Sequence, residues 1–322
     1  MLVGYIIWRI VGIKSEFEKY NWTMFVGISS GLLAALFAGS GMIFVKHIHD
    51  TGLSIPLVTA LSFLISGLFF ILVSCFTTST KQSLQTIKVL ILDKHTLICG
   101  VTGGLFLLSY YYALKFISAS VAETLTSLAP IGTYLVMKFV YKENLGKNVW
   151  LISILMIMSV YLIIFGFSLP HIEYSKDTVF GFLFILLGIL IAAFFKTSQK
   201  QVDSKIEGPI FVGTYSILAF ISILPFLNTD DIFNLANLET KVYALIIISS
   251  IREGFVWFLF FYAVRILNPF HANILQNFSY LFTIGIDYII MGVTLQTSSY
   301  VGIIMLSLTL FLVIFDLSYK KQ

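Results

Sequence analysis

The stretch "YALKFISASVAETL" at residues 112–125 returns, with changes, as "YAVRILNPFHANIL" at residues 262–275. A shift of 150 residues extends this alignment without gaps to residues 165 and 315, and ten of the 54 positions are identical. Upstream, "LLAALFAGS" (32–40) resembles "LIAAFFKTS" (190–198) at a slightly different shift. Matching hydropathy and helix ends support an internal repeat, which predicts a chain of two related halves.

The composition indicates a membrane protein. Of the 322 residues, 58% are hydrophobic and only 11% are charged, and the mean hydropathy is +0.95. A soluble domain has about a quarter of its residues charged, so this chain lacks the polar surface to cover its apolar residues in water. The net charge of +4 does not indicate a nucleic-acid partner, because the basic residues fall between hydrophobic runs. Cys75 and Cys99 show no metal-type spacing and are interpreted as small hydrophobic residues.

A helix that spans a bilayer needs about 20 mostly apolar residues. Ten windows of that kind predict an all-α integral membrane protein, near residues 23–45, 55–76, 96–114, 119–140, 148–167, 178–198, 209–227, 242–264, 269–291 and 298–316. Each half holds five of them. Because five is odd, the second half enters the membrane from the opposite side, and such inverted repeats are typical of secondary transporters.

Basic residues orient the chain. Fifteen of the 20 lysines and arginines fall on the side of the N-terminus and four on the other side, which predicts that both termini are cytoplasmic. The expected units are an N-terminal cytoplasmic or interfacial segment (1–21), the first repeat (22–167), an external linker (168–177), the second repeat (178–317) and a cytoplasmic tail (318–322).

The run "YYALKFISASVAETLTSLAPIGTYLVMKFVYKENL" resembles the EamA-type signature of the drug/metabolite transporter superfamily. Its features are the Tyr-Ala-Leu turns, a small-residue loop, a helix with a mid-span proline, and Glu-x-Leu before the next helix. The resemblance covers the chain from about Asn21. It implies a ten-helix, two-repeat transporter with a central cavity, and it places Glu143 at the family's characteristic glutamate position. Glu123 stands where the family usually has a small residue, and Val293 stands where a second such glutamate is expected.

Arg252 and Glu253 in "SSIREGFVWF" lie near the middle of the eighth predicted span. Charges at that depth are costly, by about 2.5 to 3.5 kcal/mol on insertion scales, and often mark a transport path. Consecutive helical residues point about 100° apart, so the two side chains are not expected to neutralise each other. Arg252 is suited to hold a carboxylate or phosphate, and Glu253 to hold an amine or a proton. The alternative is a structural partner on another helix, such as Glu123 or Asp287.

Polar residues also follow helical spacing on two repeat-related spans. Glu123, Thr126, Ser127 and Pro130 share one face of the fourth span, and Asn273, Gln276, Asn277 and Tyr280 occupy the equivalent positions of the ninth. Two such stripes predict opposite walls of one cavity. Snorkelling of Glu123, interhelical hydrogen bonding by the amides and a purely shape-setting Pro130 are the alternatives.

Other intramembrane residues are weighed in the same way. Asp287 and Lys196 either line the path or snorkel to their interfaces, and for Lys196 snorkelling is favoured. Tyr112 and Trp257 either stack on a substrate or belong to aromatic belts. Gly27, Gly31 and Gly39 form a strip on the first span for close packing or for sliding.

The predicted binding residues are Arg252, Glu253, Glu123, Thr126, Ser127, Asn273, Gln276, Asn277, Tyr112, Trp257 and Asp287. The predicted structural or gating residues are Pro130, Glu143, Gly27, Gly31 and Gly39.

These observations predict a secondary active transporter in the inner or plasma membrane. It moves a small polar metabolite by alternating access, with an amino acid or an amino-acid-derived zwitterion, including S-adenosylmethionine-like compounds, as the expected substrate class. Two alternatives are an antiporter of anionic metabolites such as nucleotide sugars or phosphate esters, and a non-transporting scaffold or receptor. No enzymatic activity, cofactor, metal or nucleic-acid partner is expected. The coupling partner is left open between a proton and a counter-substrate, and the oligomeric state between monomer and homodimer.

Overall fold

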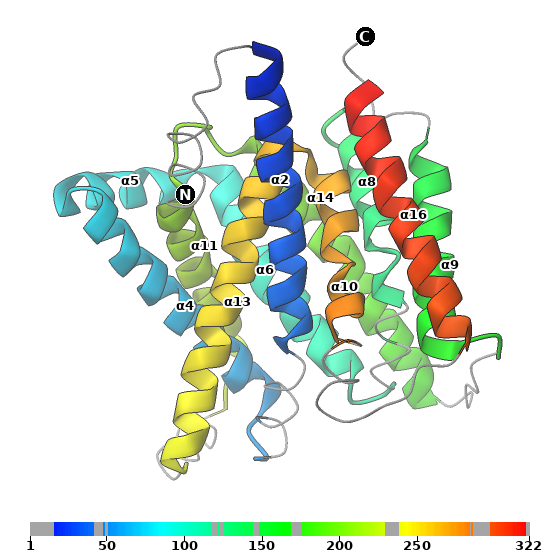
Figure 1. Ribbon diagram of the computed structural model, residues 1–322. Helices are drawn as coiled ribbons and strands as arrows, with labels where there is room; N and C mark the ends of the chain where they lie inside the picture. Colours follow the sequence, from blue (N-terminus) through cyan, green and yellow to red (C-terminus); the bar gives the residue numbers. More distant parts are fainter. Residues whose placement is uncertain are drawn as a thin grey trace.

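A computed structural model of the chain describes residues 16–41, 48, 51–117, 122, 125–143, 148–168, 176–228, 238–283, 285 and 297–319. All regular secondary structure within these ranges is helical, which confirms the predicted all-α class (Figure 1). In chain order the helices are α2 (Glu16–Gly39), α4 (Ile55–Thr77), α5 (Thr80–Leu92), α6 (Lys94–Ala113), α8 (Ala129–Phe139), α9 (Val149–Phe165), α10 (Lys176–Gln201), α11 (Gly208–Ile223), the 3₁₀ turn η1 (Leu224–Phe226), α13 (Thr240–Ile266), α14 (Pro269–Gln276) and α16 (Thr297–Tyr319).

Local sequence signals set several helix ends. Ser54 caps α4 by accepting a hydrogen bond from the Leu57 amide, and Pro56 occupies the first turn, where no amide donor is needed. Asp93 caps α6 in the same way by accepting from the amide of Thr96 at 2.8 Å. Gly166 ends α9 with a φ of 66°, a value that favours glycine.

Six of the described helices are long and apolar enough to cross a membrane: α2, α4, α6, α10, α11 with η1, and α13. Shorter apolar helices cover Val149–Ile163 and Thr297–Val313. The predicted fourth and ninth spans are not single described helices, because turns at Ser127–Leu128 and Asn277–Phe278 interrupt them. The count of ten membrane-crossing helices therefore stays a prediction. Residues 1–15 of the predicted N-terminal segment lie outside the described residues.

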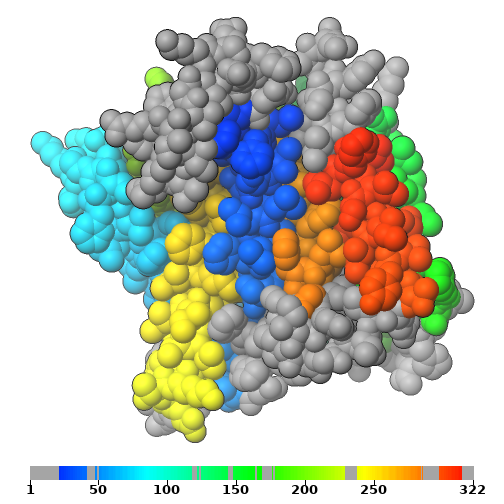
Figure 2. Space-filling model, in the orientation of Figure 1, coloured from blue at the N-terminus to red at the C-terminus, as the bar shows by residue number. Residues whose placement is uncertain are grey.

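Each helix pair between the two halves has a counterpart in which the halves have swapped roles. The first helix of the first half, α2, packs against α13 and α14, the third and fourth of the second half; α10, the first of the second half, packs against α6 and α8, the third and fourth of the first. The second helices α4 and α11 pack together, as do the fifth helices α9 and α16. Figure 2 shows α2 lying between α13 and α14 on one face of the molecule. This arrangement is that of two structural repeats related by a pseudo-two-fold axis.

Several connections that are predicted to lie on the same side of the membrane as the N-terminus meet at one end of the helix bundle. Arg265, at the end of α13, donates hydrogen bonds to the carbonyls of Asp203 and Ile206 in the α10–α11 connection, at 2.5 and 2.7 Å. The Thr78 hydroxyl, just after α4, donates to the Glu207 carboxylate before α11. In Figure 1 the start of α2 and the end of α16 also lie at this end, the top of the view.

The outer helix faces carry large apolar side chains. Leu183, Leu186, Leu187 and Leu190 of α10 are each about half exposed, although they belong to a long apolar helix. A soluble protein rarely shows such a continuous apolar face, whereas lipid solvates it. The short helix α5 lies across the direction of its neighbours at the edge of the bundle (Figure 1).

Candidate functional site

Arg252 and Glu253 form an ion pair on α13, which shows that the expected separation of their side chains is wrong. The Arg252 Nη2 atom lies 3.1 Å from Glu253 Oε2, because the guanidino side chain is long enough to reach the carboxylate although the two Cβ atoms diverge. Arg252 Nη1 also donates to the Phe37 carbonyl of α2 at 2.5 Å, and the guanidinium packs directly on Gly41. Arg252 is 9% exposed and its Nε has no hydrogen-bond partner among the described residues. Much of its hydrogen-bonding capacity is thus used within the protein.

The two predicted polar stripes contact each other across the repeats. Thr126 Oγ1 and the Tyr280 hydroxyl are 2.9 Å apart, and Asn273 Nδ2 donates to Thr133 Oγ1 at 3.0 Å. Residue numbers fall along one helix as they rise along the other, so the helices run antiparallel where they meet. Asn277 instead donates to the Met156 sulfur of α9 at 3.1 Å.

Two further members of the polar stripes, Ser127 and Gln276, are at least partly buried. Ser127 is fully buried at the helix break. Gln276 is half-buried, and its Oε1 is buried without a hydrogen-bond partner within the described ranges. Glu123 and Asp287 lie outside the described residues.

Both stripes cross helix breaks at equivalent positions. Before α8, the Leu128 amide donates to the Leu125 carbonyl and the Ile131 amide to the Leu128 carbonyl, at 3.0 and 2.9 Å. At the positions 150 residues later, the Phe278 amide donates to the Leu275 carbonyl and the Leu281 amide to the Phe278 carbonyl, at 3.1 and 3.0 Å. These are tight i→i+3 turns within otherwise α-helical segments. Discontinuous helices at matching positions of two repeats are a feature of transporter binding sites.

Lys196 of α10 is the residue that sequence reasoning misplaced. Its side chain is 5% exposed and donates from Nζ to Asn273 Oδ1 at 2.5 Å, so it is enclosed by protein and does not snorkel. Its Nζ also lies 5.4 Å from the centre of the Phe260 ring. The signal that would have found it is in the upstream repeat, where Lys196 replaces Ala38 in otherwise matching segments.

The predicted aromatic residues occupy different surroundings. Trp257 is 5% exposed in the main hydrophobic core, where its ring packs edge-on against Phe195 with centroids 4.9 Å apart. Its indole nitrogen has no hydrogen-bond partner among the described residues. Tyr112 is half-buried, stacks on Phe184 of α10 and lies beneath the ammonium of Lys115.

The glycines of α2 allow close approach of the second repeat. A Cβ atom on Gly27 would lie 2.7 Å from Ile266, and one on Gly31 would lie 2.8 Å from Leu275. At Gly39 it would lie 2.5 Å from the backbone carbonyl of Ser279, which cannot move independently of its helix. Packing is therefore the direct role of this strip.

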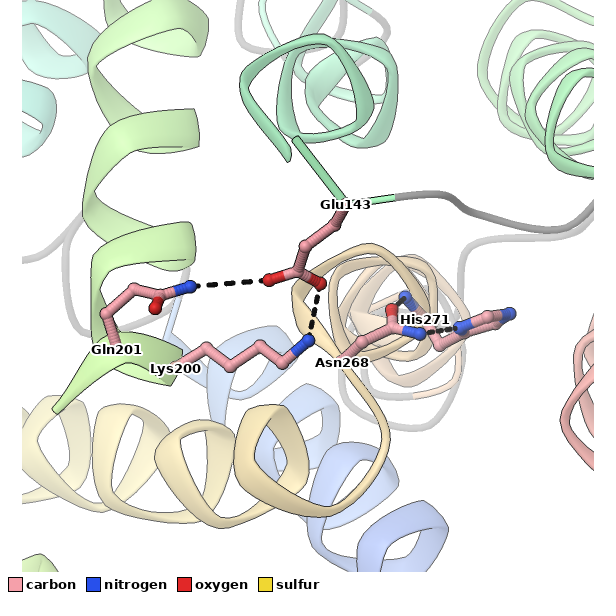
Figure 3. Close-up of polar contacts among 5 residues, drawn as sticks. All are labelled: Glu143, Lys200, Gln201, Asn268 and His271. Atoms are coloured by element: carbon pink, nitrogen blue, oxygen red, sulfur yellow. Dashed lines mark hydrogen bonds and ion pairs between the residues drawn. The ribbon is translucent and has the colours of Figure 1, made fainter. Parts of the chain in front are cut away.

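Glu143 ties the end of α8 to the end of α10 (Figure 3). Its carboxylate accepts from Lys200 Nζ at 2.5 Å and from Gln201 Nε2 at 3.3 Å. Asn268 and His271, also drawn in Figure 3, form the capping turn at the start of α14, where Asn268 Oδ1 accepts from the His271 amide. Both side chains of the ion pair remain partly exposed, so the pair is a surface salt bridge that links the two repeats.

The fold and these contacts define a multi-pass helical membrane protein built from two repeats. A family model described as the EamA-like transporter family matches residues 25–165 and again 179–315, so the chain belongs to that family and the resemblance found in its sequence is confirmed. Within the described residues, no group of three or more His, Cys, Asp or Glu side chains could hold a metal ion.

Similar proteins carry transporter names. An uncharacterized transporter in the trpA 3′ region of Buchnera aphidicola subsp. Schlechtendalia chinensis is 30% identical over 38% of this chain and 39% of its own length. An uncharacterized transporter of Helicobacter pylori is 29% identical over 40% and 44%, and the uncharacterized transporter YdfC of Bacillus subtilis is 31% identical over 33% and 35%. The aligned part thus spans less than half of each relative. A crystal structure of a protein matches 91% of this chain and 99% of its own with a TM-score of 0.69 at 15% identity, which supports the fold alone.

Proposed function

We propose that this protein is a secondary active transporter that moves a small polar metabolite by alternating access between its two repeats. The observation that carries the proposal is the exchange symmetry of the helix pairs, together with matching breaks in the two helices that bear the polar stripes. Two oppositely threaded repeats of this kind can adopt inward-open and outward-open shapes around one site. A scaffold or receptor has no need for paired breaks lined by buried amides and hydroxyls.

The substrate class proposed is an amino acid or an amino-acid-derived zwitterion, a description that an S-adenosylmethionine-like compound also fits. The buried groups between the repeats include hydrogen-bonding amides, a lysine and a tryptophan, whereas charge pairs such as Arg252–Glu253 flank them. Such a set suits a ligand with one charged end and an apolar or aromatic body. The proposed location is the inner or plasma membrane, and the distribution of basic residues supports cytoplasmic termini.

A second candidate is an exchanger of anionic metabolites. That function requires more than one buried cation near the site, and Lys196 is a buried cation in addition to Arg252. A substrate with two anionic groups would distinguish this candidate from a zwitterion transporter.

Counterflow in proteoliposomes tests the proposed function. Vesicles carrying the purified protein are loaded with an unlabelled amino-acid mixture, and uptake of each labelled amino acid is measured after dilution. Transient accumulation above the outside concentration is expected for at least one compound, and none in protein-free vesicles. Parallel vesicles loaded with phosphate esters or nucleotide sugars test the second candidate. No accumulation of any compound in either series would contradict the transporter proposal for these substrate classes.

A further inference from the structure

Lys196 is a buried lysine without an acidic partner among the residues that the structure describes. An ammonium group has three N–H donors, and the structure gives this one a single hydrogen bond, to the neutral Asn273 amide, and the face of Phe260. Within the described ranges no carboxylate lies within ion-pair distance of Lys196. Three other cations of α10 and α13 have different partners: Arg252 pairs with Glu253, Lys200 pairs with Glu143 at the surface, and Arg265 donates to two backbone carbonyls.

The lack of a carboxylate beside Lys196 in the described part of the chain is energetically significant. Removing a charged group from water costs several kcal/mol, and proteins normally offset that cost with an opposite charge and full hydrogen bonding. Packing alone offers no reason to place a lysine here, because the matching position of the first repeat holds Ala38. The position therefore suits an anion that is supplied from outside the chain.

The surroundings of Lys196 join the two repeats. Lys196 and Asn273 belong to the second repeat, and Thr133, which accepts the Asn273 amide hydrogen, belongs to the first. Phe260, two turns of α13 beyond Arg252, forms the apolar side of the site, about 12 Å along the helix from the arginine. All of these groups are buried in the conformation observed, so a ligand reaches them only when the repeats separate.

A second unsatisfied donor lies beside this cluster. The indole N–H of Trp257 has no hydrogen-bond partner among the described residues, and its ring contacts Phe260 at a centroid distance of 5.9 Å. Phe195, next to Lys196 in the chain, packs on the same indole. A ligand that presents oxygen atoms to Lys196 would thus rest its apolar body against these three rings.

We propose that Lys196, Asn273 and Thr133 bind the carboxylate of the transported metabolite, and that Trp257, Phe260 and Phe195 contact its apolar portion. The sequence alone had pointed to Arg252 for this role, but Arg252 already has a carboxylate and a carbonyl. The assignment rests on the proposed function and specifies the anion-binding end of its substrate site.

Ligand-induced stabilisation of the purified full-length protein tests the assignment. The Tm in detergent is measured with the common L-amino acids, benzoate and phenylacetate, each compared with its amide, because the amide keeps the shape and removes the negative charge. At least one carboxylate is expected to raise the Tm of the wild type while its amide does not. Lys196→Gln should weaken the apparent affinity for that carboxylate by at least about tenfold, and Lys196→Arg should retain part of it.

Matched variants keep the test decisive. Lys176→Gln removes one positive charge from the exposed start of the same helix and should leave the carboxylate response unchanged. Asn273→Asp supplies a carboxylate within the protein next to Lys196, and it should abolish the response even if Lys196→Gln fails to fold.

Two results would overturn the assignment. One is an equal effect of carboxylates and amides on the wild type, including no effect of either. The other is a carboxylate response that survives in both Lys196→Gln and Asn273→Asp. Neither result removes the transporter proposal, which stands or falls on counterflow by the wild type.

Discussion

The Arg252 and Lys196 regions place two buried basic side chains in the same repeat, and the protein satisfies them to different degrees. Arg252 lies where the first helix of one repeat meets the third of the other, and it is held by Glu253 and by the Phe37 carbonyl. Lys196 lies on the first helix of the second repeat, and its ammonium group contacts an amide and a ring but no carboxylate of the described residues. A charge deep in a membrane segment therefore does not by itself identify a ligand site. The more informative observation is how many hydrogen-bond and ion-pair partners the protein itself supplies to the charged side chain.

Replacing Arg252 should have the largest effect on stability. Arg252→Met leaves the Glu253 carboxylate largely buried and unpaired, and loss of one partner of a buried pair costs about 3–5 kcal/mol. Because Glu253 keeps some exposure, a value at the lower end is expected. Denaturant unfolding of the purified protein measures it. The double variant Arg252→Met/Glu253→Gln should recover part of the loss, and a double variant less stable than Arg252→Met would contradict the pairing.

Gly41→Ala should disturb the same region more mildly. Its added methyl group overlaps the guanidinium of Arg252, which must move away from Phe37 or push α2 outward. Overpacking of this kind costs about 1–3 kcal/mol. Since the obstacle is the arginine itself, the cost should largely vanish in an Arg252→Met background. An unchanged cost there would show that α2 and not Arg252 sets the space at Gly41.

Lys196→Met should act in the opposite direction to Arg252→Met. The ligand-free protein loses a buried basic group for which the described residues supply no acidic partner, so its unfolding free energy should stay the same or increase by about 1 kcal/mol. The same unfolding measurement applies. A loss comparable to that of Arg252→Met would mean that Lys196 supports the fold, and the contrast between the two regions would not hold.

Thr133→Val should give the smallest effect. It removes the acceptor of the Asn273 amide and thereby loosens the group that holds Lys196. Interhelical hydrogen bonds in membranes are worth about 0.6 kcal/mol, with a maximum near about 1.7 kcal/mol. A double-mutant cycle with Asn273→Leu isolates the pair, and a coupling free energy indistinguishable from zero would exclude this contact from the Lys196 region.

The sequence predicted the large-scale arrangement well, because period and composition determine it. Hydropathy predicts an all-helical membrane protein, and the repeat predicts two halves of a recognisable family, all of which the structure and the family match confirm. The equivalence of residues 150 apart also extends to the tight turns at Leu128 and Phe278. Proline at position 130 signals only one of these turns, since Tyr280 occupies the matching place.

The partners of individual charges could not be predicted from spacing. The angle between consecutive Cβ atoms suggested that Arg252 and Glu253 stay apart, yet a side chain as long as arginine reaches around that angle. Lys196 is five residues from the end of α10, a distance at which snorkelling is reasonable, and only the tertiary contact with Asn273 shows that its head points inward. Helix α5 was missed because its 13 residues are less apolar than a span and lie between two of them.

The two helix breaks differ in one residue, because Pro130 at the first is matched by Tyr280 at the second. Pro130 has no N–H, so the fourth helix can never form the bond to the Thr126 carbonyl that would make it continuous there. The Tyr280 amide donates to the Asn277 carbonyl at 3.4 Å, and unlike Pro130 this residue has the N–H that a continuous α-helix directs to the carbonyl four residues earlier, at Gln276. The break in the first repeat therefore cannot be closed by a backbone hydrogen bond at position 130, whereas the chemistry of position 280 sets no such restriction on the second.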